Sequence, residues 1–208
     1  MESVEGFILI GGAASRMGTD KSRLVIGGDT FVQRIARELA NVSAKVSLVG
    51  RPEQSDPDFP LVRDVFPLWG ALGAIHGALS GCNADWALVV ACDLPGVKTP
   101  LFERLLSFRQ DSDAVVPIQA DGRRQPLCAA YRVEGCLPQA NTLIESGERK
   151  PVALLQSVST RWVQFSELAD LPGAKGFFDN INTPQDYRRI SQPADQMTDG
   201  PDKQSQRF

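Results

Sequence analysis

The chain has 208 residues, of which 42% are hydrophobic and 23% charged, as in an ordinary soluble globular protein. Its 22 basic and 25 acidic residues give a net charge of −3, which argues against a surface that binds nucleic acid. The length suits one well-buried domain, and no apolar stretch is long enough to span a bilayer. We therefore expect a cytoplasmic protein that binds neither membranes nor nucleic acid.

The cysteines and the histidine restrict the chemistry further. The 4 cysteines lie at spacings that match no Cys-x-x-Cys motif, so we expect reduced, mostly buried thiols. The only histidine is His76, which excludes a multi-histidine metal site and makes a histidine-dependent triad improbable. We expect His76 to be a packed helix residue. Any metal would need oxygen ligands, which points to Mg²⁺.

An apolar segment at residues 7–10 stops at two glycines and leads into a loop with two cations. Gly11 and Gly12 let backbone N–H groups approach a phosphate closely, and Arg16 and Lys21 can neutralise a polyphosphate. The spacing matches neither the Gly-x-Gly-x-x-Gly fingerprint nor a P-loop. The pattern predicts a phosphate-binding loop, with an ordinary strand-to-helix turn as the alternative.

Strand and helix patterns alternate through the first half of the chain. A capping-box pattern at Thr30 and Gln33 begins a helix, and Thr99 is expected to cap another. We expect further strands at residues 45–50, 61–63 and 86–91, and a helix from residue 70. This alternation predicts an α/β fold: a single Rossmann-like domain over residues 1–190, with a mostly parallel central sheet flanked by helices.

The second half is less regular. We expect strands at residues 113–117, 126–131 and 161–165, a polar hairpin or loop at 119–124 and a helix at 135–146. Thr183 and Pro184 begin a last helix, since one is a capping residue and the other suits a first helical position. The polar residues 191–208 are predicted to be a disordered tail.

Polar residues at the ends of strands are the candidate ligands. Asp93 follows a buried strand, at the edge where open α/β sheets place their ligands, and Asp64 ends a short strand. Either carboxylate could instead cap the helix that follows it. Asn180 and Asn182 precede the last helix and are turn-forming residues by nature, so a purely structural role is the alternative for them.

Four blocks of the sequence, in order, resemble the molybdenum cofactor guanylyltransferases of the nucleotidyltransferase superfamily. They are the opening loop, the segment at Asp64 with its glycine-rich continuation, Cys-Asp-Leu-Pro at 92–95, and Phe-Phe-Asp-Asn-Ile-Asn-Thr-Pro-Gln-Asp at 177–186. The resemblance implies transfer of GMP from GTP to the terminal phosphate of molybdopterin-bound molybdenum cofactor, with release of pyrophosphate. We expect a monomer, with molybdoenzyme-maturation proteins as further partners.

The resemblance also implies roles on the nucleotide side of the site. Leu9, Ile10, Gly11 and Gly12 match the loop whose backbone faces the nucleotide and selects its base. Asp64 matches a carboxylate that binds the base or the ribose.

The resemblance also implies which residues catalyse the transfer. Arg16 and Lys21 would hold the triphosphate, with Lys21 following the charge that develops at the α-phosphate and the leaving pyrophosphate. Asp93 would bind Mg²⁺ and complete the catalytic set. Asn180 and Asn182 would lie across the cleft from Asp93 and contact the metal or the acceptor phosphate. Lys21 as a solvated surface residue is the alternative.

Three departures from the family pattern bear on the substrates. Ala13 stands where the family has a basic residue, Ala71 where it has a proline, and Gln125 where it has a histidine. A cytidylyl- or sugar-1-phosphate nucleotidyltransferase is therefore an alternative. A catalytically inactive, nucleotide-binding adaptor for cofactor delivery is another, which the presence of Lys21 and Asp93 disfavours. The loop spacing also disfavours an NAD-dependent oxidoreductase.

Overall fold

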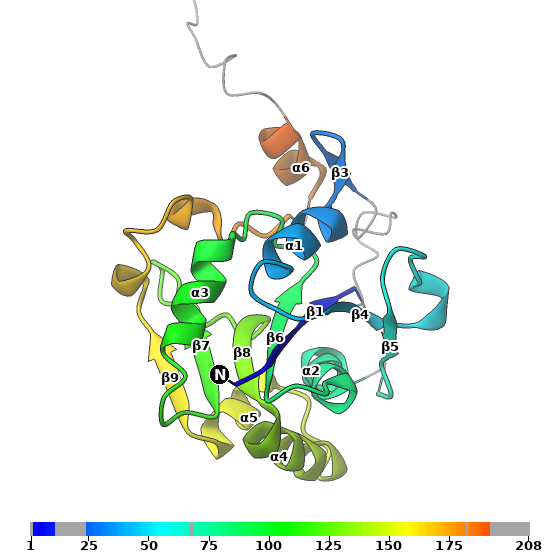
Figure 1. Cartoon of the computed structure of the whole chain (residues 1–208), viewed down its shortest axis with the longest axis vertical. Helices are drawn as coiled ribbons and strands as arrows, with labels where there is room; N and C mark the ends of the chain where they lie inside the picture. Colours follow the sequence, from blue (N-terminus) through cyan, green and yellow to red (C-terminus); the bar gives the residue numbers. More distant parts are fainter. Residues whose placement is uncertain (1, 11–23, 67–68, 182, 192–208) are drawn as a thin grey trace, which may run out of the picture.

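The computed structural model describes residues 2–10, 24–66, 69–181 and 183–191. At its centre lies a 7-stranded sheet in the order β5-β4-β1-β6-β8-β7-β9 (Figure 1). Strand β8 is antiparallel to β6 and β7, and the other neighbouring pairs are parallel. The predicted α/β fold with a mostly parallel sheet is thereby confirmed. The strand bounds are β1 Val4–Leu9, β4 Val46–Gly50, β5 Leu61–Arg63, β6 Trp86–Ala91, β7 Ala114–Pro117, β8 Cys128–Arg132 and β9 Thr160–Val163.

Helices cover both faces of the sheet (Figure 1). Helices α1 (Phe31–Leu39) and α3 (Thr99–Ser107) pack on one face, and α2 (Gly70–Gly81), α4 (Val133–Glu145) and α5 (Pro151–Ser157) pack on the other. Successive side chains of β6 alternate between the two apolar clusters that these layers bury, which is why its sequence is apolar throughout. No helix in the described ranges is long and apolar enough to cross a membrane.

A short ribbon and the last helix lie together at the periphery (Figure 1). The ribbon consists of β2 (Val25–Ile26) and β3 (Asp29–Thr30), and the helix is α6 (Pro184–Ser191). The Tyr187 hydroxyl of α6 donates to the Val25 carbonyl, and its ring lies 6.3 Å from that of Phe31. These contacts attach α6 to β2 and to the first residue of α1.

Two predicted helix starts are confirmed. Thr30 and Gln33 form the expected capping box: the Gln33 N–H donates to Thr30 Oγ1 (3.1 Å), and the Thr30 N–H to Gln33 Oε1 (2.9 Å). At α6 the Asp186 N–H donates to Thr183 Oγ1 (3.1 Å), and the Thr183 N–H returns a bond to the Asp186 carboxylate (2.9 Å). In α1 and in α6 the capping residues are close in sequence to the first turn of the helix, so the sequence alone was enough to identify them.

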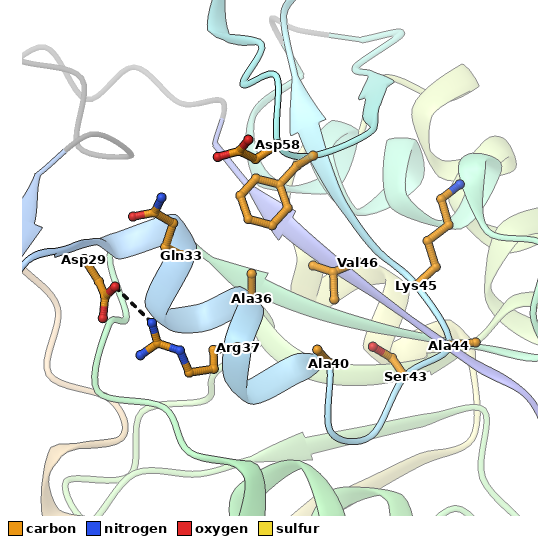
Figure 2. Close-up of a pocket in the computed structure, with 11 residues that line it drawn as sticks. Asp29, Gln33, Ala36, Arg37, Ala40, Ser43, Ala44, Lys45, Val46 and Asp58 are labelled. Carbon is orange, nitrogen blue, oxygen red and sulfur yellow. Dashed lines mark hydrogen bonds and ion pairs between the residues drawn. The ribbon is translucent and has the colours of Figure 1, made fainter.

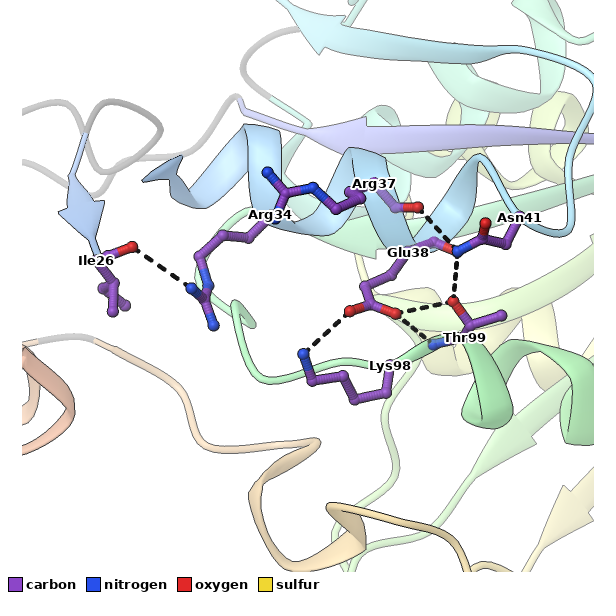
Figure 3. Close-up of polar contacts among 7 residues, drawn as sticks. All are labelled: Ile26, Arg34, Arg37, Glu38, Asn41, Lys98 and Thr99. Atoms are coloured by element: carbon purple, nitrogen blue, oxygen red, sulfur yellow. Dashed lines mark hydrogen bonds and ion pairs between the residues drawn. The ribbon is translucent and has the colours of Figure 1, made fainter. Parts of the chain in front are cut away.

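The prediction that Thr99 caps α3 was wrong. The helix begins at Thr99, and the Thr99 N–H donates to the carboxylate of Glu38 on α1 (2.9 Å), as does its hydroxyl (2.8 Å; Figure 3). Lys98 Nζ donates to the other oxygen of Glu38 (3.0 Å). A neighbouring helix therefore supplies the acceptor, and Glu38 fixes the end of the loop that joins β6 to α3.

We expect Glu38→Gln to lower the free energy of unfolding at neutral pH by about 1 kcal/mol. Burial acts to raise the pKa of Glu38, but the bonds from Thr99 and Lys98 outweigh it, so the folded pKa lies below the ordinary value of 4.5. The carboxylate therefore stabilises the fold above that value and loses its contribution as pH falls through the folded pKa. Urea titrations at neutral pH and at an acidic pH below the folded pKa should show that the difference between the variant and the parent protein shrinks at the acidic pH. The exposed Glu103 of α3 provides the control variant Glu103→Gln, which should match the parent protein at both pH values.

Candidate active site

The order of the strands places a ligand crevice at one edge of the sheet. The chain runs outward from β1 through β4 to β5 and then returns to β6 on the other side of β1. Helices α1 and α2, which lie on these two paths, cover opposite faces. The carboxyl ends of β1 and β6 are therefore the topological switch point, where open α/β sheets bind ligands.

Asp64 and Asp93 both lie at this edge. Asp64 directly follows β5, and Asp93 follows β6 by two residues. Strands β4 and β1 lie between β5 and β6, so three strand spacings, roughly 14 Å, separate the two strand ends. The two carboxylates therefore stand on either side of the end of β1, too far apart to bind one ion together.

The structure brings Asn180 to Asp93. The Asn180 side-chain amide donates to Asp93 Oδ2 (3.4 Å), and the backbone N–H of Ile181 donates to the Asp93 carbonyl (3.0 Å). The Cys92 N–H donates to the carbonyl of Leu9 (3.1 Å), so the end of β1 is joined to the same loop. Asn180 therefore contacts Asp93 directly, whereas the sequence predicted that it lies across a cleft from it, and the roles of both residues in binding stay predictions.

A glycine contact joins the same two segments. Gly96 packs so closely on the backbone at Gly176 that a Cβ on Gly96 would lie 2.2 Å from the Gly176 carbonyl oxygen. Gly96 follows Asp93 by three residues, and Gly176 precedes Asn180 by four. The absence of a side chain at residue 96 is therefore a condition for the approach of Asn180 to Asp93.

Asp64 is held by its own loop and by α2. Its N–H donates to the Gly50 carbonyl (3.0 Å), and its Oδ1 accepts from the Phe66 N–H (2.9 Å). The buried His76 of α2 packs edge-on against Phe66, with ring centroids 5.1 Å apart. Burial raises the pKa of Asp64, and the Phe66 N–H and the His76 ring partly oppose this effect. His76 is thus a packed helix residue, as expected, that lies behind the Asp64 loop.

The small residues of α2 allow this close packing. A Cβ on Gly73 would lie 2.6 Å from the Phe66 carbonyl oxygen, and one on Gly77 would lie 3.0 Å from Val49 Cγ1. One turn further along, Gly81 faces Val62 in the same way. The glycines spaced four apart therefore let α2 lie directly on β4, β5 and the Asp64 loop.

We expect Asp64→Asn to raise the free energy of unfolding at neutral pH by less than about 1 kcal/mol. A carboxyl whose folded pKa is raised stabilises the fold only while protonated, so its ionised form at neutral pH is a cost that asparagine removes. The Asn Oδ1 can still accept from Phe66. Thermal unfolding at about pH 7 and pH 4 checks the sign, because the gain should shrink at the lower pH. A loss of stability at neutral pH would contradict this account of Asp64.

Of the remaining predicted site residues, the structure describes Leu9 and Ile10 but not the others. Leu9 and Ile10 lie at the end of β1, where the Ile10 N–H donates to the Val49 carbonyl (3.0 Å). Gln54, which sequence reasoning missed, donates its amide to the Ile10 carbonyl (3.0 Å) and fixes the β4–β5 loop against this edge. Gly11, Gly12, Arg16, Lys21 and Asn182 lie outside the described residues, so their roles stay predictions.

Two hollows in the surface differ in their relation to this edge. A groove of about 600 Å³ lies between α1 and the β4 side of the sheet, with Arg37, Lys45 and Asp58 among its walls (Figure 2), and no predicted site residue lines it. A cavity of about 670 Å³ is bordered by Asn180 and therefore adjoins Asp93. We call it the Gln119 cavity; its walls include Gln119, Arg123, Phe165, Lys175, Phe178 and Asn180.

Sequence reasoning did not select Gln119 or Lys175. Gln119 lies in the predicted polar hairpin, which the structure confirms through the bridge between Ile118 and Arg124. Lys175 lies two residues before the Phe-Phe-Asp-Asn block, and that position was the one available signal.

The described residues around Asp93 supply one carboxylate rather than a complete metal site, so the binding of Mg²⁺ by Asp93 stays a prediction. Among the described residues, no group of three or more His, Cys, Asp or Glu side chains could hold a metal by itself. Mg²⁺ commonly takes one or two carboxylates, together with substrate phosphates and water. Asp93 is such a carboxylate, and the neighbouring Asn180 donates its amide N–H to it. The arrangement suits a site that is completed when a phosphate ligand binds.

Comparison with known proteins identifies the family. The model of the MobA-like NTP transferase domain matches residues 6–161. The chain belongs to the MobA-like NTP transferase family. It is 34% identical to a molybdenum cofactor guanylyltransferase of Vibrio atlanticus, over 88% of this chain and 93% of the relative. It is 30% identical to a probable molybdenum cofactor guanylyltransferase of Bacillus cereus, over 90% and 95% of the two chains. The family resemblance seen in the four blocks is confirmed.

Solved structures agree with this family at the level of fold. Molybdopterin-guanine dinucleotide biosynthesis protein A of Archaeoglobus fulgidus superposes with a TM-score of 0.76 at 24% identity, covering 90% of this chain and 96% of the other. A 2-C-methyl-D-erythritol 4-phosphate cytidylyltransferase of Thermus thermophilus superposes with a TM-score of 0.65 at 18% identity, covering 92% and 98%. The fold is therefore shared by transferases named for different nucleotides, and it does not select the base.

Proposed function

We propose that this protein transfers GMP from GTP to the terminal phosphate of the molybdopterin-bound molybdenum cofactor. The observation that carries the proposal is the meeting of Asp93, which follows β6 at the switch point, with Asn180. It joins the Cys-Asp-Leu-Pro block to the closing block, which is the one that most resembles the guanylyltransferases. The names of the relatives from Vibrio atlanticus and Bacillus cereus support the same donor and acceptor.

The reaction needs positioning and charge neutralisation rather than a dedicated base. An oxygen of the acceptor phosphate attacks the α-phosphorus of GTP, the bond from that phosphorus to the bridging oxygen breaks, and pyrophosphate leaves with the electron pair. The acceptor phosphate is already a nucleophile. A chain with 1 histidine can therefore catalyse the transfer by orienting the two substrates and neutralising the phosphates.

The proposed roles follow the edge of the sheet. Asp64 binds the ribose or base beyond β5, and the loop after β1 holds the triphosphate through Arg16 and Lys21. Asp93 holds Mg²⁺, with Asn180 on the acceptor side. When bound, the ion neutralises phosphate charge and aligns the phosphate oxygens. Mg²⁺ dependence, a cytoplasmic monomer and hand-over to maturation proteins are further predictions of this proposal.

Calorimetric titration with GTP, CTP, ATP and UTP in the presence of Mg²⁺ tests the choice of donor. We expect GTP to bind at least about tenfold more tightly than the other three, because a backbone that reads base edges discriminates by hydrogen bonding. Tighter binding of CTP would favour a cytidylyltransferase of the same fold and would overturn the guanylyl assignment. An Asp93→Ala variant with full turnover would instead remove the metal assignment.

A further inference from the structure

His76 of α2 is a buried polar side chain whose ring is held by a second helix. It is the only histidine of the chain and is 6% exposed. Its Nε2 lies 2.7 Å from Asn141 Oδ1 on α4, which is an acceptor, so the Nε2–H donates. Ser80 Oγ lies 3.4 Å from both ring nitrogens. Apolar residues such as Ile75 and Leu79 already pack α2 on the sheet, and this packing does not explain a polar ring at residue 76.

The ring of His76 supports Phe66, which lies in the segment that follows β5. The two ring centroids are 5.1 Å apart and the ring planes meet at 75°, the edge-to-face arrangement that aromatic pairs favour. The backbone of Phe66 is held on the same helix: its carbonyl accepts from the Trp69 N–H (2.8 Å), and a Cβ on Gly73 would lie 2.6 Å from it. Side chain and backbone are thus both fixed against α2, which sets the direction of the Phe66 N–H.

Phe66 in turn holds Asp64. The Phe66 N–H donates to Asp64 Oδ1 (2.9 Å), whereas Val65 between them is 59% exposed, so the support of the carboxylate comes through Phe66. Burial raises the pKa of Asp64, and the two groups that oppose this effect are the Phe66 N–H and the His76 ring. A carboxylate accepts several hydrogen bonds, so the bond from Phe66 leaves capacity for a hydroxyl or N–H of a nucleoside. His76 and Phe66 together therefore orient Asp64 and favour its ionised form.

We propose that His76 is a positioning residue for the donor nucleotide: through Phe66, its ring sets the orientation in which the Asp64 carboxylate accepts from the ribose or the base. This role rests on the proposed function, which assigns Asp64 to the nucleoside, and adds the residue that holds the carboxylate in place. His76 itself lies behind the segment and acts through Phe66 and Asp64. Loss of the ring should therefore weaken nucleotide binding and leave the transfer step unchanged.

Three variants of His76 separate the ring contact from the bond between the helices. We expect His76→Leu, which removes both, to raise the KM for GTP about fivefold and to leave kcat within about twofold. His76→Gln keeps a donor for Asn141 but has no ring, and should lose as much. His76→Phe keeps a ring edge against Phe66 without the bond to Asn141, and should stay within about twofold of the parent protein. A residue that merely links α2 to α4 would show the opposite order for the Gln and Phe variants.

A double-mutant cycle with Asp64→Ala, measured by calorimetric titration with GTP and Mg²⁺ in the absence of acceptor, tests the route of the effect. His76→Leu should weaken binding about fivefold in the parent protein and less than about twofold in Asp64→Ala. Ile75→Val, a change at a fully buried neighbour on α2, is the control and should leave the affinity within about twofold.

Unchanged affinity in His76→Leu, an equal loss in His76→Phe, or the same loss without the Asp64 carboxylate overturns the role of His76. Tighter binding of another triphosphate, or failure of transfer to the acceptor, counts against the proposed function alone, because the same cycle is then measured with the triphosphate that binds most tightly. If none of GTP, CTP, ATP and UTP binds, both fail.

Discussion

Replacing Asp93 with asparagine is expected to lower kcat for GMP transfer about a thousandfold. The variant keeps the shape of the side chain and leaves the backbone bond from Ile181 to the residue 93 carbonyl in place. It removes the negative charge that we assign to the metal at the acceptor end of the site. Pyrophosphate release under saturating GTP and cofactor measures the effect.

The exposed carboxylate Asp170 provides the control. It pairs with Arg104 of α3 (2.8 Å), which is not a residue that we assign to the site. Asp170→Asn should retain the kcat of the parent protein. If Asp93→Asn kept more than about a tenth of the parent activity, the assignment of Asp93 as a catalytic ligand would have to be withdrawn.

Gly96→Ala is expected to lower the free energy of unfolding by about 2 to 3 kcal/mol and to reduce activity as well. The new Cβ would lie 2.2 Å from the carbonyl oxygen of Gly176, and both sides of this contact are backbone. The two segments must therefore separate, which moves Asn180 away from Asp93. Urea denaturation and turnover on the same preparation measure the two effects together.

The partner glycine gives a matched control. A Cβ on Gly176 would meet no atom within 4 Å, so Gly176→Ala should leave stability within about 0.5 kcal/mol of the parent protein. A large loss of stability in Gly96→Ala together with an unchanged stability in Gly176→Ala would show that the close backbone contact at Gly96 is responsible. Equal effects of the two substitutions would show that something other than this contact sets the stability of the region.

The fold was predictable where local sequence determines local structure. The apolar residues of β6 predicted a strand buried on both faces, and the Thr30 and Thr183 patterns predicted helix starts. The antiparallel direction of β8 was not predictable, because the sequence of a strand carries no signal of its direction. Helix α5 was missed because it is short and is stabilised by burial of Leu154 and Leu155 rather than by its own sequence pattern.

For the site, the sequence predicted individual residues that lie in recognisable blocks but did not predict the contacts that depend on packing. Asp93 and Asn180 were selected because each lies in a recognisable block, but their meeting depends on the close approach of Gly96 to Gly176, which the sequence does not show. Gln119 was not selected, because its burial depends on the packing of the loop at residues 119–122. Glu38 was missed as the acceptor for α3 for a related reason: it belongs to a different helix.

The measurement that tests the central claim most directly is the formation of the guanine dinucleotide cofactor from GTP and the molybdenum cofactor, followed by mass detection of the product. We expect pyrophosphate release to require both substrates and to stop when either is omitted. We also expect CTP to support less than about a tenth of the GTP rate. Equal or faster transfer from CTP, or transfer to a sugar 1-phosphate in place of the cofactor, would contradict the account.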